Sequence, residues 1–257
     1  MSTNKVEKII ITGNLKQNPK TLKESISLVK NYIKIKKLYK NIELSIATPT
    51  VFLFPLVKEF GKKINIYSQN VSSQNGGAHT GENSAQMLSS IGVKNTIIGH
   101  SERRSVGEDN EQISKQIENA LLQNMQITLC VGESQRYTDA SHIKFVEDQL
   151  ETALLNIKKT QAKNITIAYE PVWAIGQNAT RNANQNEIYE MTIIIRKKLV
   201  EMFGRTAGGD IPIIYGGSVN KDNIDEVMSV HNISGILIGR ASLDTKELQK
   251  IIELIIK

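Results

Sequence analysis

Cysteine is nearly absent from this 257-residue sequence, and long hydrophobic runs are missing altogether. The single cysteine, Cys130, cannot form a disulfide within the chain, which favours a reducing compartment. No apolar run approaches the roughly 20 residues that a membrane-spanning helix needs. The polar start MSTNKVEKIIITGN has no signal-peptide pattern. We therefore expect a cytoplasmic protein with no membrane partner.

The usual cofactor motifs are missing too. The sequence has neither the G-x-G-x-x-G pattern of dinucleotide sites nor the G-x-x-x-x-G-K-[ST] pattern of P-loops. The histidines at positions 79, 100, 142 and 231 lack metal-binding spacing such as H-E-x-x-H. No G-x-S-x-G turn marks a serine nucleophile. We therefore expect chemistry without a cofactor or a metal.

The charge of the chain is modestly basic, with a formal net charge of +6. The lysines are spread through amphipathic segments such as KNYIKIKKLYK and form no polybasic tail. This distribution is typical of solvated helix faces, so we expect no nucleic-acid partner. The hydrophobic content of 40% and charged content of 23% are those of an ordinary globular protein.

Short β-branched apolar runs recur along the chain and alternate with helix-like segments. Nearly continuous apolar runs are typical of strands buried on both faces of a parallel sheet. One helix-like segment, 21–35, opens with a capping box formed by Thr21 and Glu24. The expected strands are 8–14, 42–49, 64–70, 95–101, 125–133, 164–171, 211–218 and 235–242, and the clearest helices are 21–35, 109–123, 145–159, 187–203 and 245–257.

The alternation predicts right-handed βαβ units and a parallel sheet. Eight such units in a chain of this length favour a closed (β/α)8 barrel, the TIM barrel, over an open doubly wound sheet. The sequence contains no Pro/Ser-rich linker and no change in composition. We therefore expect a single domain spanning residues 1–257.

In such a barrel, function belongs to the carboxyl ends of the strands. The expected strands end in chemically distinctive residues. These are Asn14 with Lys16 after strand one, His100 with Glu102 after strand four, Glu170 after strand six, and the Gly-rich turns 216–218 and 239–240 after strands seven and eight. Together they put a cation, an imidazole, a carboxylate and two turns on one rim.

Each feature has a simpler interpretation when it is taken alone. Lys16 could be solvated, and His100 could be a hydrogen-bonded packing residue. Glu170 could cap a helix or pair with a cation, and Ser218 in YGGS could cap a helix after an ordinary turn. HSERR could be an ion-pair cluster. The simpler interpretations require several independent coincidences at equivalent ends of the barrel.

The set as a whole suits one kind of chemistry. Gly-rich turns that lead into helices offer backbone N–H groups to a phosphate. A carboxylate can act as a general base, and a neutral histidine as an electrophile at a carbonyl oxygen. Lysine adds positive charge where an enediolate develops negative charge. The sequence thus predicts proton transfer on a small phosphorylated carbonyl compound.

Six motifs occur in the order and spacing of a known family. They are GNLKQN, GAHTGENSAQML, GHSERR, CVGE, AYEPVWAIG and YGGSV. Across nearly its whole length the chain resembles triosephosphate isomerases. The resemblance implies interconversion of dihydroxyacetone phosphate and D-glyceraldehyde 3-phosphate, a step of glycolysis and gluconeogenesis.

The resemblance also implies a role for each matching residue. Glu170 matches the base, His100 the neutral electrophile and Lys16 the stabilising cation. The segment 171–181 matches a lid that closes over the site, held by backbone contacts to Tyr215 and Ser218. Asn14 matches a residue beside Lys16, Glu102 a supporting carboxylate, and Gly217 a supporting residue between Tyr215 and Ser218. The phosphate cradle is matched by Gly176, Ser218, Gly239 and Arg240.

The family is normally dimeric, so the resemblance implies a homodimer. Residues 77–82 match a protruding loop that enters the neighbouring subunit. Thr80 and Glu82 would then lie at the interface, with Thr80 near the partner's site.

The chain departs from the family pattern in three places. Leu15 and Gln17 replace the usual Trp and Met. Arg240 replaces the second glycine after strand eight, and it would be strained if that position needs a positive φ. The second half of the lid, QNATRN (177–182), replaces the common Thr-Gly-Lys followed by Thr/Val-Ala-Thr. We expect phosphate binding and an intact lid with altered opening kinetics, in which Asn178 can adopt a positive φ where Gly is usual.

Two other functions remain open from the residues alone. A catalytically silent barrel could serve in binding or adhesion, although Lys16, His100 and Glu170 are all intact. A lyase or aldolase on a phosphate-binding barrel would place a Schiff-base lysine on a strand inside the barrel, whereas Lys16 lies beyond the end of strand one.

Overall fold

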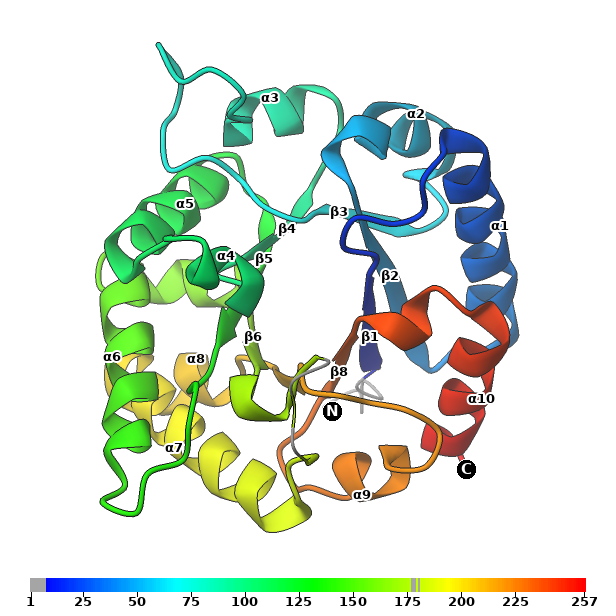
Figure 1. Cartoon of the computed structure of the whole chain (residues 1–257). Coiled ribbons are helices and arrows are strands. Elements are labelled where there is room, and N and C mark those ends of the chain that lie inside the picture. Colours follow the sequence, from blue (N-terminus) through cyan, green and yellow to red (C-terminus); the bar gives the residue numbers. More distant parts are fainter. Residues whose placement is uncertain (1–7, 177–178, 180) are drawn as a thin grey trace, which may run out of the picture.

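The computed structural model describes residues 8–257 except 177, 178 and 180. Eight parallel strands pair in chain order and close into a barrel (Figure 1), so the chain is a single-domain TIM barrel, as the sequence predicts. The strands are β1 (Ile9–Asn14), β2 (Ile42–Thr48), β3 (Asn65–Ser68), β4 (Asn95–Ile98), β5 (Gln126–Val131), β6 (Ile165–Tyr169), β7 (Ile213–Tyr215) and β8 (Gly235–Ile238).

Helices surround the barrel in a ring (Figure 1). The longer ones supply the crossover connections between neighbouring strands, and short helices and 3-10 turns shape the loops. The α-helices are α1 (Leu22–Leu38), α2 (Thr50–Phe60), α3 (Ala85–Ser90), α4 (Ser101–Ser105), α5 (Asn110–Leu122), α6 (Ser141–Leu154), α7 (Gln185–Phe203), α8 (Arg205–Gly209), α9 (Ile224–Met228) and α10 (Thr245–Ile255); the 3-10 turns are η1 (Lys159–Asn164), η2 (Val172–Ala174) and η3 (Arg240–Ser242).

The core has two layers because each strand buries both of its faces. One layer lies between the strands and the helices, and a smaller one fills the barrel interior. Cys130 belongs to the interior layer and is fully buried. The interior layer consists of Ala47, Tyr67, Ile97, Cys130, Ala168, Ile214 and Leu237.

The barrel closes where β8 pairs with β1, with Ile10 opposite Gly235 in the register. The two backbones are so close there that a Cβ at Gly235 would collide with the backbone of Ile10. Only glycine permits this approach. The seam of the barrel thus depends on a residue without a side chain.

Capping residues in the sequence mark where the main helices begin. Thr21 and Glu24 form the expected capping box at α1, and Asp109 with Gln112 forms another at α5. Each box satisfies backbone N–H groups that a helix start leaves unpaired, and loss of such a cap costs about 1 kcal/mol. The helices therefore begin where their capping residues place them.

Several expected boundaries are wrong, and those of two elements differ most. The helix expected at 145–159 is α6, which begins at Ser141 and ends at Leu154. The apolar period continues to Ile157, but Leu155 is 70% exposed and the chain turns there into η1. The strand expected at 235–242 ends at Ile238, because the backbone turns at Gly239 into η3.

The loops at the carboxyl ends of the strands carry the expected site. The loop between β3 and α3, which contains residues 77–82, projects from the barrel (Figure 1) and is exposed throughout those residues. Among the helices of the described residues, none combines the length and the apolar character that a membrane span requires.

Candidate active site

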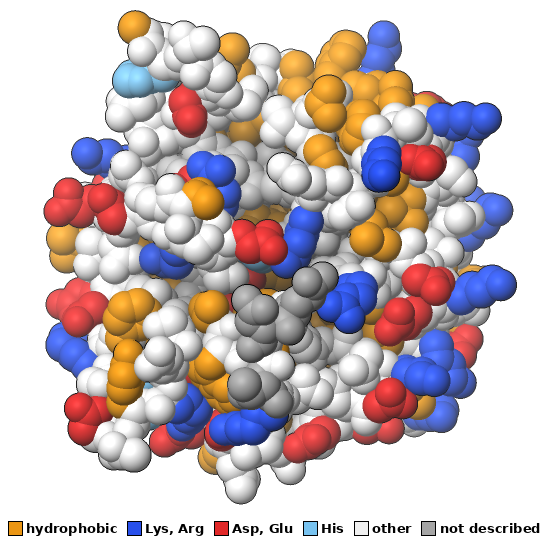
Figure 2. Space-filling view, in the orientation of Figure 1, with side chains coloured by type: hydrophobic (Ala, Val, Ile, Leu, Met, Phe, Trp, Pro, Cys, Tyr) orange, Lys and Arg blue, Asp and Glu red, His pale blue; other side chains and the backbone are white. Residues whose placement is uncertain are grey.

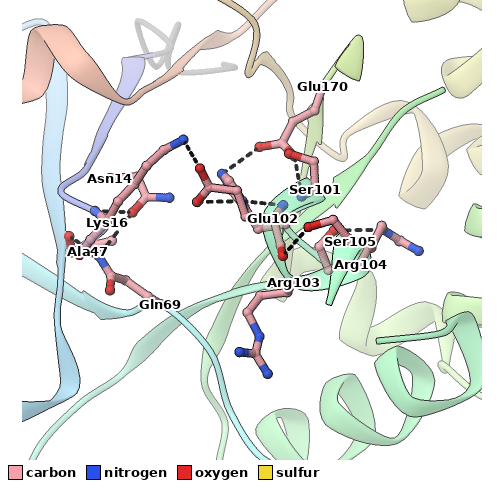
Figure 3. Close-up of polar contacts among 12 residues, drawn as sticks. Asn14, Lys16, Ala47, Gln69, Ser101, Glu102, Arg103, Arg104, Ser105 and Glu170 are labelled. Atoms are coloured by element: carbon pink, nitrogen blue, oxygen red, sulfur yellow. Dashed lines mark hydrogen bonds and ion pairs between the residues drawn. The ribbon is translucent and has the colours of Figure 1, made fainter. Parts of the chain in front are cut away.

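Lys16 is held at the end of β1 by a small polar network. The Lys16 backbone N–H donates to Asn14 Oδ1 at 3.0 Å, and the Gln69 side-chain amide donates to the same oxygen at 3.1 Å and to the Lys16 carbonyl at 2.9 Å. Lys16 has a φ of +51°, which is uncommon for a residue with a side chain. The network therefore fixes an otherwise unfavourable turn and directs the lysine side chain across the barrel mouth (Figure 3).

His100 stands at the N-terminus of α4, with only 7% of its surface exposed. Its Nδ1 accepts the Glu102 backbone N–H at 3.2 Å. With Nδ1 used as an acceptor, Nε2 is the ring nitrogen that can serve as a donor.

Glu170 follows β6 directly and is 2% exposed. Its Oε2 accepts the Ser101 backbone N–H at 2.9 Å, and its Oε1 lies 3.3 Å from His100 Nε2. The carboxylate thus rests against the N-terminus of α4 (Figure 3) and occupies the direction in which His100 can donate. Any substrate oxygen that takes this donor requires Glu170 to move away from it.

Glu102 connects the two sides of the rim. Its Oε1 lies 2.6 Å from Lys16 Nζ, and the side-chain exposures are 59% and 33%. Lys16 also lies beside the turn after β8, because a Cβ at Gly239 would be 3.4 Å from Lys16 Cε. The ends of β1, β4 and β8 therefore meet around one lysine, which is paired and not freely solvated.

Arg240 follows Gly239 as the first residue of η3, and its side chain is exposed. Among the described residues, the non-glycine residues with positive φ are Lys16, Asn124, Ala140 and Asn232. Arg240 is not one of them, so the backbone strain considered for this position does not arise.

The turn after β7 contacts the start of the segment expected to form a lid. Ser218 Oγ donates to the Ala174 carbonyl at 2.9 Å, so it ties this turn to η2 and does not cap a helix. Tyr215 is buried, which raises the pKa of its phenol, and Gly217 packs directly against its hydroxyl. Gly176 has a φ of +81°, a conformation that favours glycine. Gln177, Asn178 and Thr180 lie outside the described residues, so the expectation for Asn178 stays a prediction.

A second buried carboxylate, Glu133, lies behind the first part of this segment. Its Oε1 accepts the Trp173 indole N–H at 2.7 Å and the Tyr169 hydroxyl at 2.9 Å. Glu133 is 1% exposed, and its Oε2 has no hydrogen-bond partner. Burial raises the pKa of Glu133, and these donors oppose the rise without cancelling it.

The two arginines of HSERR have a structural function. Arg103 pairs with Glu108 at 2.7 Å, and Arg104 donates to the backbone carbonyls of Gly99 at 2.8 Å and Cys130 at 3.2 Å. Arg104 thereby links the ends of β4 and β5. The motif therefore combines an ion-pair cluster with two residues that face the rim, and both interpretations of it hold in part.

Within the described ranges, no three His, Cys, Asp or Glu side chains are grouped to hold a metal ion. The polar groups at the rim instead present one lysine, one imidazole donor, one carboxylate and Gly-rich turns. These can bind an anion, donate to a carbonyl oxygen and take up a proton. Chemistry without a cofactor stays a prediction.

Comparison with known proteins places this geometry in a family. The family model described as "Triosephosphate isomerase" matches residues 9–255. The chain belongs to the triosephosphate isomerase family. Membership assigns it to the isomerases.

Relatives agree along almost the full length. The triosephosphate isomerase of Cytophaga hutchinsonii is 38% identical over 246 residues, which cover 94% of this chain and 97% of the relative. That of Acetivibrio thermocellus is 39% identical over 248 residues, which cover 95% and 97%. The crystal structure of triosephosphate isomerase from Bartonella henselae superposes with a TM-score of 0.86 at 31% identity, covering 97% of this chain and 100% of that one.

In this member of the family, the structure brings together most of the rim residues expected from the sequence. Lys16, Glu102, His100 and Glu170 form one chain of contacts, and Asn14 and Gly239 adjoin Lys16. Thr80 and Glu82 lie in the projecting loop, apart from this chain of contacts.

Two residues of the site, Gln69 and Glu133, have no role among the expectations from the sequence, although Glu133 belongs to the motif CVGE. The available signal was a polar side chain at or near the end of an expected strand, 64–70 for Gln69 and 125–133 for Glu133.

Proposed function

We propose that this chain interconverts dihydroxyacetone phosphate and D-glyceraldehyde 3-phosphate, as a step of glycolysis and gluconeogenesis. The observation that carries the proposal is the chain of contacts from Lys16 through Glu102 and His100 to Glu170, in a member of the triosephosphate isomerase family. It joins a cation, an imidazole and a buried carboxylate at one barrel mouth.

In the proposed reaction, Glu170 removes a proton from the carbon next to the substrate carbonyl. The electron pair of the broken C–H bond forms an enediolate, whose oxygen receives a hydrogen bond from His100 Nε2 and positive charge from Lys16. Glu170 then returns the proton to the neighbouring carbon, while His100 moves a proton between the two oxygens. Every proton taken up is returned, so the reaction needs no cofactor.

Glu170 reaches the substrate by leaving Ser101, and closure of the 171–181 lid accompanies that movement. Pro171, with φ of −65°, gives the lid a stiff first hinge. Closure removes water from the carboxylate and protects the enediolate. Lids that close in this way are best known from triosephosphate isomerases themselves.

The proposed phosphate cradle consists of the turns at Gly176, Ser218 and Gly239–Arg240, next to Lys16. Arg240 leaves its backbone N–H available, and its side chain is exposed. We therefore expect Arg240→Gly to change the KM for glyceraldehyde 3-phosphate by less than about threefold, as for other surface substitutions. Binding at least tenfold tighter in that variant would show that Arg240 disturbs the cradle.

A coupled assay with glyceraldehyde 3-phosphate tests the proposed function. We expect turnover without added metal or nucleotide, and a large loss of kcat in Glu170→Asp, because the shortened side chain withdraws the base from the carbon. An absence of turnover would favour the catalytically silent barrel. Undiminished turnover in Glu170→Asp would refute the assignment of the base.

We also propose a homodimer that forms through residues 77–82. Two features support it: the loop projects with Thr80 and Glu82 exposed, and apolar side chains gather over α2 (Figure 2). Two of these, Val51 and Phe54, are 75% and 54% exposed. Sedimentation should give twice the 28.6 kDa mass of the chain, and replacement of 77–82 by a short Gly-Ser turn should give monomers.

A further inference from the structure

The barrel has a second opening, at the amino ends of the strands and opposite the proposed active site. A cavity of about 630 Å³ lies there, between the first residues of most strands and the loops that lead into them. This volume falls within the range of roughly 300–1,000 Å³ that small-molecule sites occupy. Catalysis in TIM barrels belongs to the other end, so the proposed reaction leaves this cavity without a function.

The strand residues that face into this cavity are mostly polar. Strands β2 to β6 each contribute one residue to the interior layer, and side chains alternate between the two faces of a strand. The residue two or four positions earlier therefore also faces inward. Those that line the cavity in this way are Glu43, Asn65, Asn95, Gln126 and Thr166. Bulky branched apolar residues usually fill a barrel interior, so this polar layer is unusual.

Asn95 is the most informative member of the polar layer. It lies opposite Gln126 in the β4–β5 register, and only 7% of its surface is exposed. Its backbone carbonyl accepts from Ser68 Oγ at 3.5 Å, but its side-chain amide forms no hydrogen bond with another described residue. A buried amide without a partner is unfavourable, so Asn95 is suited to exchange hydrogen bonds with a molecule in the cavity.

The neighbouring carboxamides also retain unused donors and acceptors. Asn65 Nδ2 donates to Glu43 Oε1 at 3.3 Å, and Gln126 Nε2 donates to Asn164 Oδ1 at 3.2 Å. Each contact uses one N–H of an amide that has two N–H donors and a carbonyl acceptor. A ligand with hydroxyl or amide groups of its own can therefore pair with this layer both as donor and as acceptor.

Positive charge surrounds the cavity. Four exposed lysines line it together with one carboxylate, that of Glu43, and within the described residues none of the four forms an ion pair. They are Lys58, Lys62, Lys94 and Lys163. An excess of one sign of charge around a concave surface attracts ligands of the opposite sign, and lysine commonly binds phosphate. The cavity is therefore suited to an anion.

Tyr67 closes the inner end of the cavity. It is 7% exposed and belongs both to the cavity lining and to the packed interior layer. That layer separates the cavity from the mouth that carries Lys16, His100 and Glu170. A ligand in the cavity therefore lies apart from these residues and does not compete with the substrate.

We propose that this cavity binds a small phosphorylated metabolite, with its polar body against the carboxamides and its phosphates against the lysines. Nucleotides and sugar bisphosphates share this chemistry. The binding groups come from separate strands and loops, so no contiguous sequence motif marks the site. It lies at the opposite end of the barrel from the proposed catalytic residues, and binding there does not depend on the proposed function.

Isothermal titration calorimetry of the full chain tests the site, with ATP and fructose 1,6-bisphosphate as separate probes in EDTA at low ionic strength. We expect one of them to bind one molecule per chain with a Kd below about 1 mM. Inorganic tripolyphosphate has similar charge but no polar body, so it should bind about tenfold more weakly. The tighter metabolite identifies the ligand as a nucleotide or a sugar phosphate. Binding of neither metabolite, or equal binding of tripolyphosphate, would overturn the proposal.

Two substitutions of Asn95 locate the bound probe. Asn95→Trp places a bulky side chain in the cavity and should abolish binding. Asn95→Leu keeps a similar volume but removes the amide, and it should weaken binding about tenfold. Isomerase kcat and KM should stay within about twofold of wild type in both, because the substitution is distant from the rim. Undiminished binding in Asn95→Leu would overturn the proposal even if Asn95→Trp does not fold.

A double variant, Lys94→Ala/Lys163→Ala, tests the phosphate contacts. Exposed ion pairs are individually weak, so we expect the two losses together to weaken binding by about three- to tenfold. The matched control is Lys30→Ala/Lys115→Ala, which removes two exposed lysines of α1 and α5 that lie outside the cavity lining. It should leave the affinity unchanged. Equal affinities of the two double variants would show that the cavity lysines bind no phosphate.

The cavity site and the isomerase function fail separately. Absence of glyceraldehyde 3-phosphate turnover in wild type would refute the proposed function and leave the titrations unaffected, because these measure binding alone. Turnover in a wild-type protein that binds neither ATP nor fructose 1,6-bisphosphate would refute the cavity site alone.

Discussion

Two buried carboxylates lie side by side at the ends of β5 and β6, and they are held in opposite ways. Glu133 is 1% exposed and Glu170 is 2% exposed, so burial does not distinguish them. Glu133 accepts from Tyr169 and Trp173, neutral side chains of β6 and η2. Glu170 accepts from the backbone at the start of α4 and adjoins His100, on the fixed rim. The neighbours of a carboxylate, and not its burial, indicate what it does.

The contrast favours different proposed functions for the two residues. Glu133 holds η2 through Trp173, and under the proposed function it would anchor the first part of the lid. Glu170 can exchange the Ser101 N–H for a substrate without unfolding any element. In the proposed mechanism, the carboxylate held by the rim is the one that moves, and the carboxylate held by the lid is the anchor of the lid.

The largest expected effect comes from removing each negative charge in turn. Glu170→Gln should reduce kcat by about 10³-fold, within the range that positioned general bases contribute. Glu133→Gln should reduce kcat by less than tenfold, because it removes no group that meets the substrate. The coupled isomerase assay measures both, and equal losses in the two variants would erase the distinction between base and anchor.

The second effect concerns the free energy of unfolding, for which we expect the larger loss at Glu133 and not at Glu170. Glu133→Ala leaves the Tyr169 hydroxyl and the Trp173 indole N–H without an acceptor, which should lower the free energy of unfolding by about 1–3 kcal/mol. Urea denaturation followed by far-UV circular dichroism gives this value. Trp173→Phe in the same background is the control, since it removes one stranded donor and should recover part of the loss.

The smallest effect is the pH dependence of stability. Burial raises the pKa of Glu133 above its unfolded value, so its contribution is fully present below the unfolded pKa and is lost as pH rises through the folded pKa. Arg181 lowers the pKa of Glu187, so that contribution is present above the unfolded pKa and is lost as pH falls through the folded one.

These opposite signs can be separated by comparing variants. From pH 4 to 7, the unfolding free energy of wild type should fall relative to Glu133→Gln and rise relative to Glu187→Gln. Urea denaturation at each pH measures both differences. If the difference in unfolding free energy between wild type and Glu133→Gln does not change with pH, the direction assigned to the pKa shift of Glu133 is wrong.

Much of the rim could be predicted because parallel strands bring their carboxyl ends to one place. Polar residues directly after apolar runs, such as Asn14, His100 and Glu170, therefore identified the rim without any contact being known. Short elements were harder to predict, because α4, α8 and α9 have five residues each and show no apolar period. Their ends are determined by neighbouring loops.

Contacts between distant residues could not be predicted from the sequence. Gln69 reaches back to Asn14, and Arg181 meets Trp173 and Glu187 only because the chain folds over itself. The segment QNATRN is unusual for the family in its sequence alone. That its arginine covers the tryptophan depends on side-chain geometry, which no spacing rule contains.

The seam between β1 and β8 has a consequence for synthesis of the chain. Ile10 pairs with Gly235, so β1 cannot complete its pairing until almost the whole chain has left the ribosome. Until then, β1 and the newest strand present unpaired edges that can pair with other chains. We expect nascent chains truncated before residue 235 to depend on chaperones, and that dependence to end when β8 emerges and the sheet has no edge left.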